Sequence, residues 1–216
     1  MEYEQTQQNE PAHRLARRSL LAAGLGGAAV TVAPLLQRAV SASTPPGSEP
    51  PASTTTTAPK RPTADDVVLL GAAQSLELAA RDLYAMAVGN KPSDATLAAV
   101  LATIHDDHMA YAQELAGLIG RDAPDTADAA LTDQHSSAFS GSDTKALLAA
   151  AATLEADLAQ THCEAIGQLK AVSGARVLAS IAVVEGRHGT VLADLGQSKD
   201  LDELLSPAAT RLTVKG

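Results

Sequence analysis

The sequence predicts an all-α protein built around an antiparallel four-helix bundle. Four segments carry apolar residues at three- and four-residue steps, which is the helical period, and no strand-like alternation of comparable length accompanies them. Short loops join the first segment to the second and the third to the fourth, so each pair is expected to form an antiparallel hairpin. A longer connection, residues 121–141, should cross over between the two hairpins.

Residues 1–42 have the features of an export segment. The paired arginines Arg17-Arg18 precede an apolar run, Leu20 to Leu36, which glycines and a proline interrupt. This arrangement resembles a twin-arginine signal peptide, and Val40-Ser41-Ala42 fits a small-x-small cleavage site. The glycines and the proline make this run a poor permanent membrane anchor, which favours a cleaved signal. An uncleaved N-terminal anchor is the alternative. We therefore expect export across the cytoplasmic membrane by the twin-arginine route, to the cell envelope or the extracellular space.

The rest of the chain divides into three parts. Residues 43–62 are rich in Ser, Thr, Pro and Gly and cannot bury enough apolar area to order themselves, so they predict a disordered linker. Residues 63–196 should form the bundle, and residues 197–216 a short helix and a tail. The expected bundle helices span 63–88, 94–119, 143–172 and 175–195, with a short helix at 127–132 inside the crossover.

Composition excludes several classes of function. The formal net charge is −9 without a basic stripe, which argues against nucleic-acid binding because that binding relies on neutralising phosphates. Aromatic residues make up 2% of the chain and tryptophan is absent, so base-stacking surfaces are not expected. The single cysteine, Cys163, cannot form an intramolecular disulfide and is interpreted as an inert packed thiol.

Polar residues interrupt the apolar stripes of all four expected helices near their middle. They are spaced seven or three residues apart, so each set shares one helix face. Burying carboxylates and imidazoles is costly unless they are paired or bind a metal, and the pattern therefore predicts a metal site at the centre of the bundle. The candidate ligands are Glu77, His105, His108, Glu155, Glu185 and His188, with Tyr84 and His162 as weaker candidates.

These motifs resemble the ferritin-like superfamily over Asp65 to Leu195, and in particular its exported members that follow a signal and a tether. In that family two helices each supply a Glu, and the other two each supply a Glu-x-x-His, to hold two iron or manganese ions. Glu77 and Glu155 match the single glutamates, and Glu185-Gly-Arg-His188 matches the full motif. His105-Asp-Asp-His108 keeps the histidine but has a second histidine where the metal-bridging Glu belongs.

The resemblance implies the long-crossover connectivity and an atypical centre with one or two ions. Mixed imidazole and carboxylate ligands favour iron or manganese, with zinc possible, over calcium or magnesium. Three functions follow as alternatives: a metal-binding domain that oxidises ferrous iron or reduces peroxide, a redox-silent scaffold for cell-envelope or stress-related partners, and a manganese catalase-like enzyme. The expected partners are the metal ion and, as an option, a second copy in a homodimer; a membrane enters only through an uncleaved signal.

Neighbouring residues have simpler interpretations. Tyr84 fits a core tyrosine as well as a ligand, and His162 fits a hydrogen-bond partner of a carboxylate as well as a ligand. Asp106 and Asp107 should point away from the polar face, and His135 should be a surface residue in the crossover. All the polar residues together could instead form a metal-free network of ion pairs.

Overall fold

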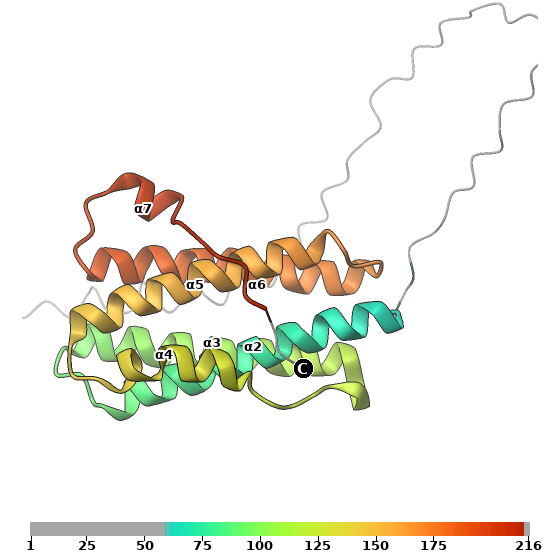
Figure 1. The fold of residues 1–216 in the computed structure, drawn as a ribbon, viewed down its shortest axis with the longest axis horizontal. Helices are drawn as coiled ribbons and strands as arrows, with labels where there is room; N and C mark the ends of the chain where they lie inside the picture. Colours follow the sequence, from blue (N-terminus) through green and yellow to red (C-terminus); the bar gives the residue numbers. More distant parts are fainter. Residues whose placement is uncertain (1–58, 60, 214–216) are drawn as a thin grey trace, which may run out of the picture. The chain divides into compact units, whose positions relative to one another are not determined.

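The structure is a computed structural model that describes residue 59 and residues 61–213, and Figure 1 shows its arrangement of helices. Within this part of the chain there is no β-strand, and no helix is long and apolar enough to cross a membrane. The predictions for residues 1–42 and for most of residues 43–62 lie outside the described residues. The helices are α2 (Ala64–Gly89), α3 (Ala95–Ile119), the 3-10 helix η1 (Gly120–Asp122), α4 (Ala129–Ser140), α5 (Thr144–Ile166), α6 (Val172–Leu195) and α7 (Leu201–Leu205). The predicted all-α fold is confirmed.

Side-chain caps fix where the bundle helices begin. Thr63 and Asp66 form a reciprocal capping box at the start of α2, which satisfies two backbone N–H groups that the first turn leaves free. The Asp94 carboxylate accepts from the Leu97 N–H at the start of α3. Asp143 caps α5 in the same way. The N-cap residue of α6, Ala171, provides no side-chain cap.

The four long helices form two hairpins, α2 with α3 and α5 with α6, as predicted. Asn90, in the α2–α3 turn, donates from its side-chain amide to the carbonyls of Phe139 and Gly141, just before α5 begins. At the opposite end of α2, the Asp66 carboxylate accepts from the backbone N–H groups of Lys170 and Ala171 in the α5–α6 turn. Therefore α3 and α5 run in the same direction, and the crossover returns along the length of the bundle (Figure 1).

Three predicted boundaries differ from the structure. The fourth bundle helix begins at Val172 instead of residue 175. The third bundle helix ends at Ile166 instead of residue 172, because the chain turns at Gly167 and the N–H groups of Lys170 and Ala171 donate to Asp66, a contact distant in sequence. The crossover helix α4 has 12 residues and is twice as long as expected. It packs on α2 and α5 through Leu131, His135 and Phe139, which lie four residues apart on one face.

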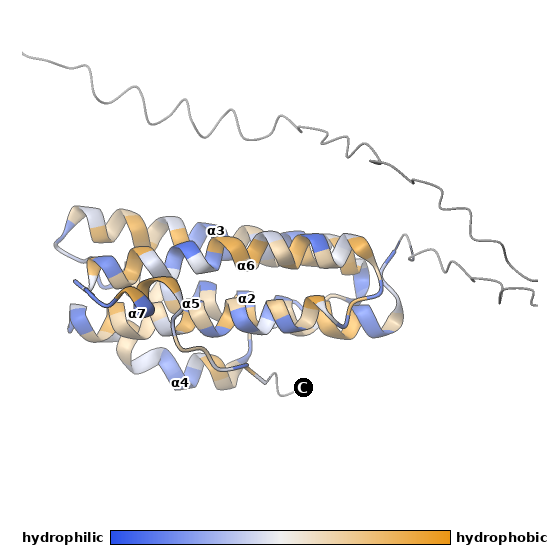
Figure 2. Cartoon of the chain, turned by 90° about the horizontal axis from the view of Figure 1, so that it is seen from above, coloured by the Kyte–Doolittle hydropathy of each residue, from blue (hydrophilic) through white to orange (hydrophobic). Residues whose placement is uncertain are grey.

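Two apolar clusters fill the bundle, one on each side of a polar layer. The larger lies around the end of α2, the start of α3 and the first half of α5, with α4 packed on it. The smaller joins the start of α2, the end of α3 and the first half of α6. Figure 2 shows hydrophobic and hydrophilic residues alternating in short blocks along the helices, as amphipathic packing requires. The predicted polar residues fall at the level where the two clusters meet.

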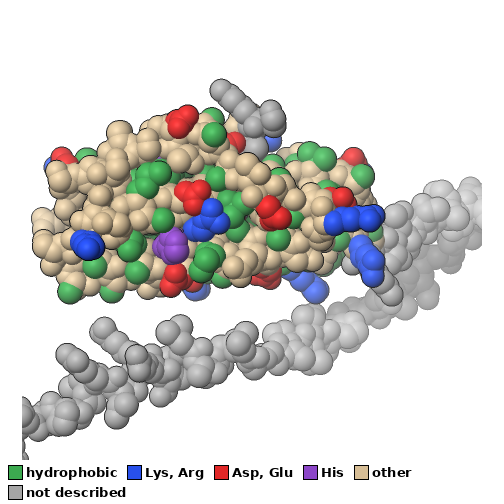
Figure 3. Space-filling model, turned by 90° about the horizontal axis from the view of Figure 1, so that it is seen from below, with side chains coloured by type: hydrophobic (Ala, Val, Ile, Leu, Met, Phe, Trp, Pro, Cys, Tyr) green, Lys and Arg blue, Asp and Glu red, His purple; other side chains and the backbone are tan. Residues whose placement is uncertain are grey.

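The outer surface is mixed in character. On the face that Figure 3 shows, acidic, basic and hydrophobic side chains are interspersed without one extended patch of a single kind. The large apolar side chains exposed among the described residues include Val68, Val183 and Leu205, which lie on three different helices. Scattered apolar residues of this kind are normal on a protein surface and mark no particular site.

Candidate metal centre

Six titratable side chains meet inside the bundle, and all four long helices contribute. We call them the buried cluster: Glu77 from α2, His108 from α3, Glu155 and His162 from α5, and Glu185 and His188 from α6. Five of them are 0% exposed, and His188 is 9% exposed. Charged groups removed from water to this extent are tolerated only with close partners or a bound ion.

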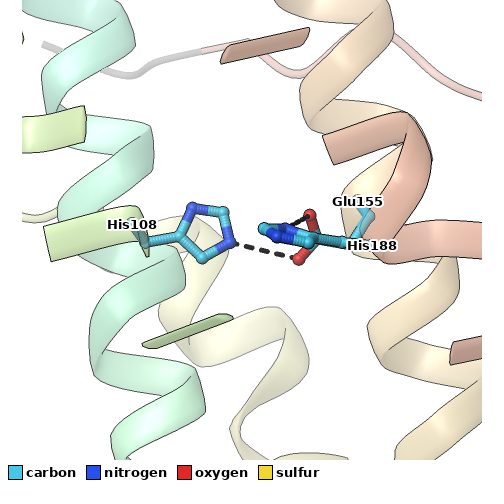
Figure 4. Close-up of side chains that lie close together, drawn as sticks. All are labelled: His108, Glu155 and His188. Atoms are coloured by element: carbon cyan, nitrogen blue, oxygen red, sulfur yellow. Dashed lines mark hydrogen bonds and ion pairs between the residues drawn. The ribbon is translucent and has the colours of Figure 1, made fainter. Parts of the chain in front are cut away.

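Glu155 is the centre of one half of the cluster. Its Oε1 accepts a hydrogen bond of 2.6 Å from the Tyr84 hydroxyl and lies 3.1 Å from His108 Nε2. Its Oε2 lies 3.1 Å from His188 Nδ1. Figure 4 shows both imidazoles directed at this carboxylate from α3 and α6. Every carboxylate oxygen of Glu155 therefore has at least one donor.

The imidazoles of this first half are held as cations. His108 also places Nδ1 at 2.7 Å from Glu77 Oε2, so both of its ring nitrogens face carboxylates and both must carry hydrogen. His188 Nε2 likewise lies 3.2 Å from Asp107 Oδ2. We refer to His108, Glu155 and His188 as the paired trio, because every nitrogen and oxygen of their side chains has a hydrogen-bond partner.

The other three residues, Glu77, His162 and Glu185, are incompletely paired. His162 Nδ1 lies 3.0 Å from Glu185 Oε2. Three buried atoms, Glu77 Oε1, His162 Nε2 and Glu185 Oε1, have no hydrogen-bond partner. His162 Nε2 is 3.3 Å from Glu77 Oε1 and counts as an ion pair by distance, but the two atoms do not meet the geometry of a hydrogen bond. We call these residues the open trio.

The pKa values follow from burial and from these contacts. Burial alone raises the pKa of Glu155, but the charges and hydrogen bonds of His108 and His188 outweigh it and hold the pKa at about 2. Burial lowers the pKa of His162, and the carboxylates of Glu185 and Glu77 more than reverse this and raise it to about 9. Burial raises the pKa of Glu185 above its usual range, and His162 only partly opposes the change.

Three carboxylates and three imidazoles can balance their charges without metal. Burial lowers the pKa values of His108 and His188, whereas Glu155 raises both above the usual histidine value and gives a net increase. An ion-pair network of this kind accounts for the contacts of the paired trio. It does not account for the three unpartnered atoms of the open trio, since an unsatisfied buried polar atom costs about 1–3 kcal/mol.

This charge balance predicts the pH dependence of the metal-free protein. Raised histidine pKa values give stability that is fully present below pH 6.5 and lost as pH rises through the folded pKa, which is about 9 for His162. The lowered pKa of Glu155 gives stability that is present above pH 4.5 and lost towards about pH 2. We expect the melting temperature of chelator-treated protein to be highest between these limits and to fall from pH 7 to 10. A constant melting temperature over that alkaline range would contradict these pairings.

The structure brings together most, but not all, of the predicted ligands. Glu77, His108, Glu155, Glu185 and His188 lie in the cluster, and so does the weaker candidate His162. Tyr84 is fully buried beside them; it donates to Glu155, and its ring stacks on His108 with the centroids 5.4 Å apart. His105 lies outside the cluster at the edge of α3, where its Nδ1 is 2.9 Å from Asp106 Oδ1.

Three interpretations of neighbouring residues were wrong. Asp107 is not purely solvated, because His188 reaches across from α6 to pair with it. His135 is buried on α4 and not in a surface loop, and burial lowers the pKa of its imidazole. Cys163 is exposed and not packed. Only the contact of Asp107 touches the cluster.

Two grooves approach the cluster from different faces. One, of about 520 Å³, lies between α3 and α6 and is lined by His188 among mostly apolar side chains. The other, of about 200 Å³, is lined by His162 and by the C-terminal segment Arg211–Thr213. That segment is tied to α5, since the Leu212 N–H donates to Thr161 Oγ1 at 2.9 Å. His162 of the open trio thus lines a groove beside residues 211–213, and His188 of the paired trio lines the other groove.

Comparisons with known proteins agree with this architecture. A family model described as the ferritin-like domain matches residues 65–198, which include all four bundle helices and the whole buried cluster. Neither the comparison with curated proteins nor that with solved structures gave a match.

Proposed function

The chain belongs to the ferritin-like domain family, and from this premise we propose that it is an exported protein whose buried cluster binds iron, manganese or zinc. The observation that carries the proposal is the open trio. Each of its three residues has one buried atom without a hydrogen-bond partner, and the three residues offer ligand atoms that lie within 4.8 Å of one another. One cation could therefore contact all three residues.

The chemistry of these side chains indicates the class of metal. Two carboxylates and one imidazole form a mixed oxygen and nitrogen set, which suits iron, manganese and zinc. Calcium and magnesium prefer oxygen-only shells, so they fit this set less well. Neither trio contains a thiolate, and Cys163 is exposed, which disfavours ions that require sulfur ligands.

Bound iron or manganese would supply electron transfer to dioxygen or peroxide, as the family resemblance implies. The residues of the chain would hold the ion, keep bulk water away and position protons nearby. Burial and the adjacent Glu155 raise the pKa of Tyr84 well above its usual value, so the phenol keeps its proton. On the basis of the family resemblance, the activity that we propose is oxidation of ferrous iron or reduction of peroxide at this atypical centre.

Export is supported by the N-terminal sequence alone. The paired arginines at Arg17-Arg18, the broken apolar run and the cleavage pattern all favour the twin-arginine route. Residues 43–62 would then tether the bundle to its site of export or be its new N-terminus. A redox-silent scaffold is the alternative function, and it rests on the charge balance of the cluster.

Elemental analysis of protein isolated after export tests metal binding directly. We expect iron, manganese or zinc to co-purify with the wild-type bundle and to be lost from Glu185→Ala, because this change removes a ligand atom that has no other partner. The matched control is His105→Ala, which removes a histidine outside the cluster and should retain the metal. Near-zero metal in the wild type, or equal metal in Glu185→Ala, would favour the scaffold instead.

An activity assay then separates the two redox alternatives from the scaffold. Metal-loaded wild type should consume peroxide, or oxidise ferrous iron, faster than the same amount of free metal. Turnover no faster than free metal would exclude an enzymatic role and leave metal binding in place.

A further inference from the structure

We propose that each chain holds a single metal ion at Glu77, His162 and Glu185, and that His108, Glu155 and His188 form a metal-independent network of ion pairs. This inference rests on the proposed function and deepens it, because it assigns the ion to one half of the cluster. It also gives His162 the role of a ligand, although the family pattern places no ligand at that position.

The first step of the argument is the unequal pairing of the two trios. The unpartnered atoms of the buried cluster all belong to the open trio, one on each residue. Each of these residues is also 0% exposed, so the side chains lie away from bulk solvent. The open trio therefore has three buried positions that a bound ion could contact.

The second step is that the paired trio has no free position. Glu155 already has the Tyr84 hydroxyl and two imidazoles within hydrogen-bond distance. His108 and His188 each use their second nitrogen on another carboxylate. A metal ion here would have to break these contacts, whereas none of the unpartnered atoms would gain a partner.

The third step is the sequence difference that produces the asymmetry. The two halves of the chain place Glu77 and Glu155 at equivalent positions, and seven residues later Tyr84 in one half corresponds to His162 in the other. Tyr84 donates its proton to Glu155, whereas His162 turns an unpartnered nitrogen towards Glu77. The second half therefore adds a nitrogen ligand where the first half adds a hydroxyl donor.

The Glu-x-x-His motifs of the two halves of the chain also differ, and again the additional ligand is in the second half. Glu185 is fully buried in the open trio, while its counterpart in the first half, His105, lies at the edge of α3 beside Asp106. The first half of the chain therefore lacks both of these ligands, because Tyr84 and His105 occupy the positions that His162 and Glu185 occupy in the second half. Three protein ligands leave at least one coordination position for a small oxygen ligand such as water or peroxide, as in catalytic zinc sites.

The test is a cobalt(II) and zinc(II) titration of metal-free full-length protein, with the number of bound ions measured for two matched variants. His162→Ala removes a ligand, and His188→Ala removes a histidine from the paired trio. We expect one ion per chain in the wild type and in His188→Ala, and at least a hundredfold loss of affinity in His162→Ala. Circular dichroism checks that each variant is folded.

X-ray absorption of the zinc-loaded wild type provides a second test that needs no variant. One imidazole per zinc is expected for the open trio, and two imidazoles would indicate the paired trio. Two ions per chain, two imidazoles per zinc, or loss of binding in His188→Ala equal to that in His162→Ala would overturn the inference and leave metal binding intact. No bound ion in the wild type would instead refute the proposed function itself.

Discussion

Replacing Glu155 by alanine is expected to destabilise the metal-free protein by about 3–5 kcal/mol, because it removes one partner from a buried set of ion pairs. The change leaves His108 and His188 without the carboxylate that they share, and it leaves the Tyr84 hydroxyl without an acceptor. Tyr84 and His108 cannot turn to bulk water, since both are fully buried. Urea unfolding followed by circular dichroism measures the loss.

His105→Ala is the control for this experiment. It removes a histidine from the same bundle whose side-chain partner among the described residues is the exposed Asp106, so its effect should stay within about 0.5 kcal/mol. Equal effects of the two variants, or a loss below about 1 kcal/mol for Glu155→Ala, would show that the paired trio does not stabilise the bundle as described.

Metal binding is expected to stabilise the wild-type bundle by a comparable amount. An ion that binds only the folded state adds about 2.7 kcal/mol at a free concentration of 100 times Kd, and about 4.1 kcal/mol at 1,000 times Kd. Thermal unfolding with increasing zinc(II) or manganese(II), and its reversal by a chelator, measures this gain.

The matched variant for metal stabilisation is Glu77→Gln. It keeps the size of the side chain but removes a negative charge that faces both His162 and the proposed ion. We expect the metal-dependent rise in melting temperature to disappear in this variant. A rise as large as that of the wild type would place the ion elsewhere.

Much of the fold could be predicted from the sequence because its signals are local. The start of α2 follows from Thr63 and the acids of its first turn, and the length of α3 follows from regular apolar spacing. The end of α5 could not be found in this way, since it depends on Asp66, about 100 residues earlier in the chain, which binds the turn. The length of α4 depends equally on packing against α2 and α5.

The contents of the centre were predictable, but the division into two trios was not. Helical spacing identified all six residues of the buried cluster. It could not decide between His105 and His108, because residues three apart lie about 60° from each other on a helix and a small rotation about its axis determines which one faces inward. In the structure, Ile104 and His108 take the buried positions and His105 lies at the edge.

The pairing of Asp107 with His188 could not be predicted from the sequence for a similar reason. The spacing on α3 alone directs Asp107 away from the centre, yet α6 packs beside α3, and His188 reaches the boundary between the two helices. Contacts across a helix interface depend on how the helices are placed, and a single sequence does not record that.

The most direct test of a single metal ion in the open trio is an anomalous difference map from crystals of the zinc- or iron-loaded protein, measured at the absorption edge of the metal. The account predicts one peak per chain, within about 2.0–2.2 Å of His162 Nε2 and of carboxylate oxygens of Glu77 and Glu185. A peak between His108 and His188, two peaks of equal height, or no peak in metal-saturated crystals would contradict it.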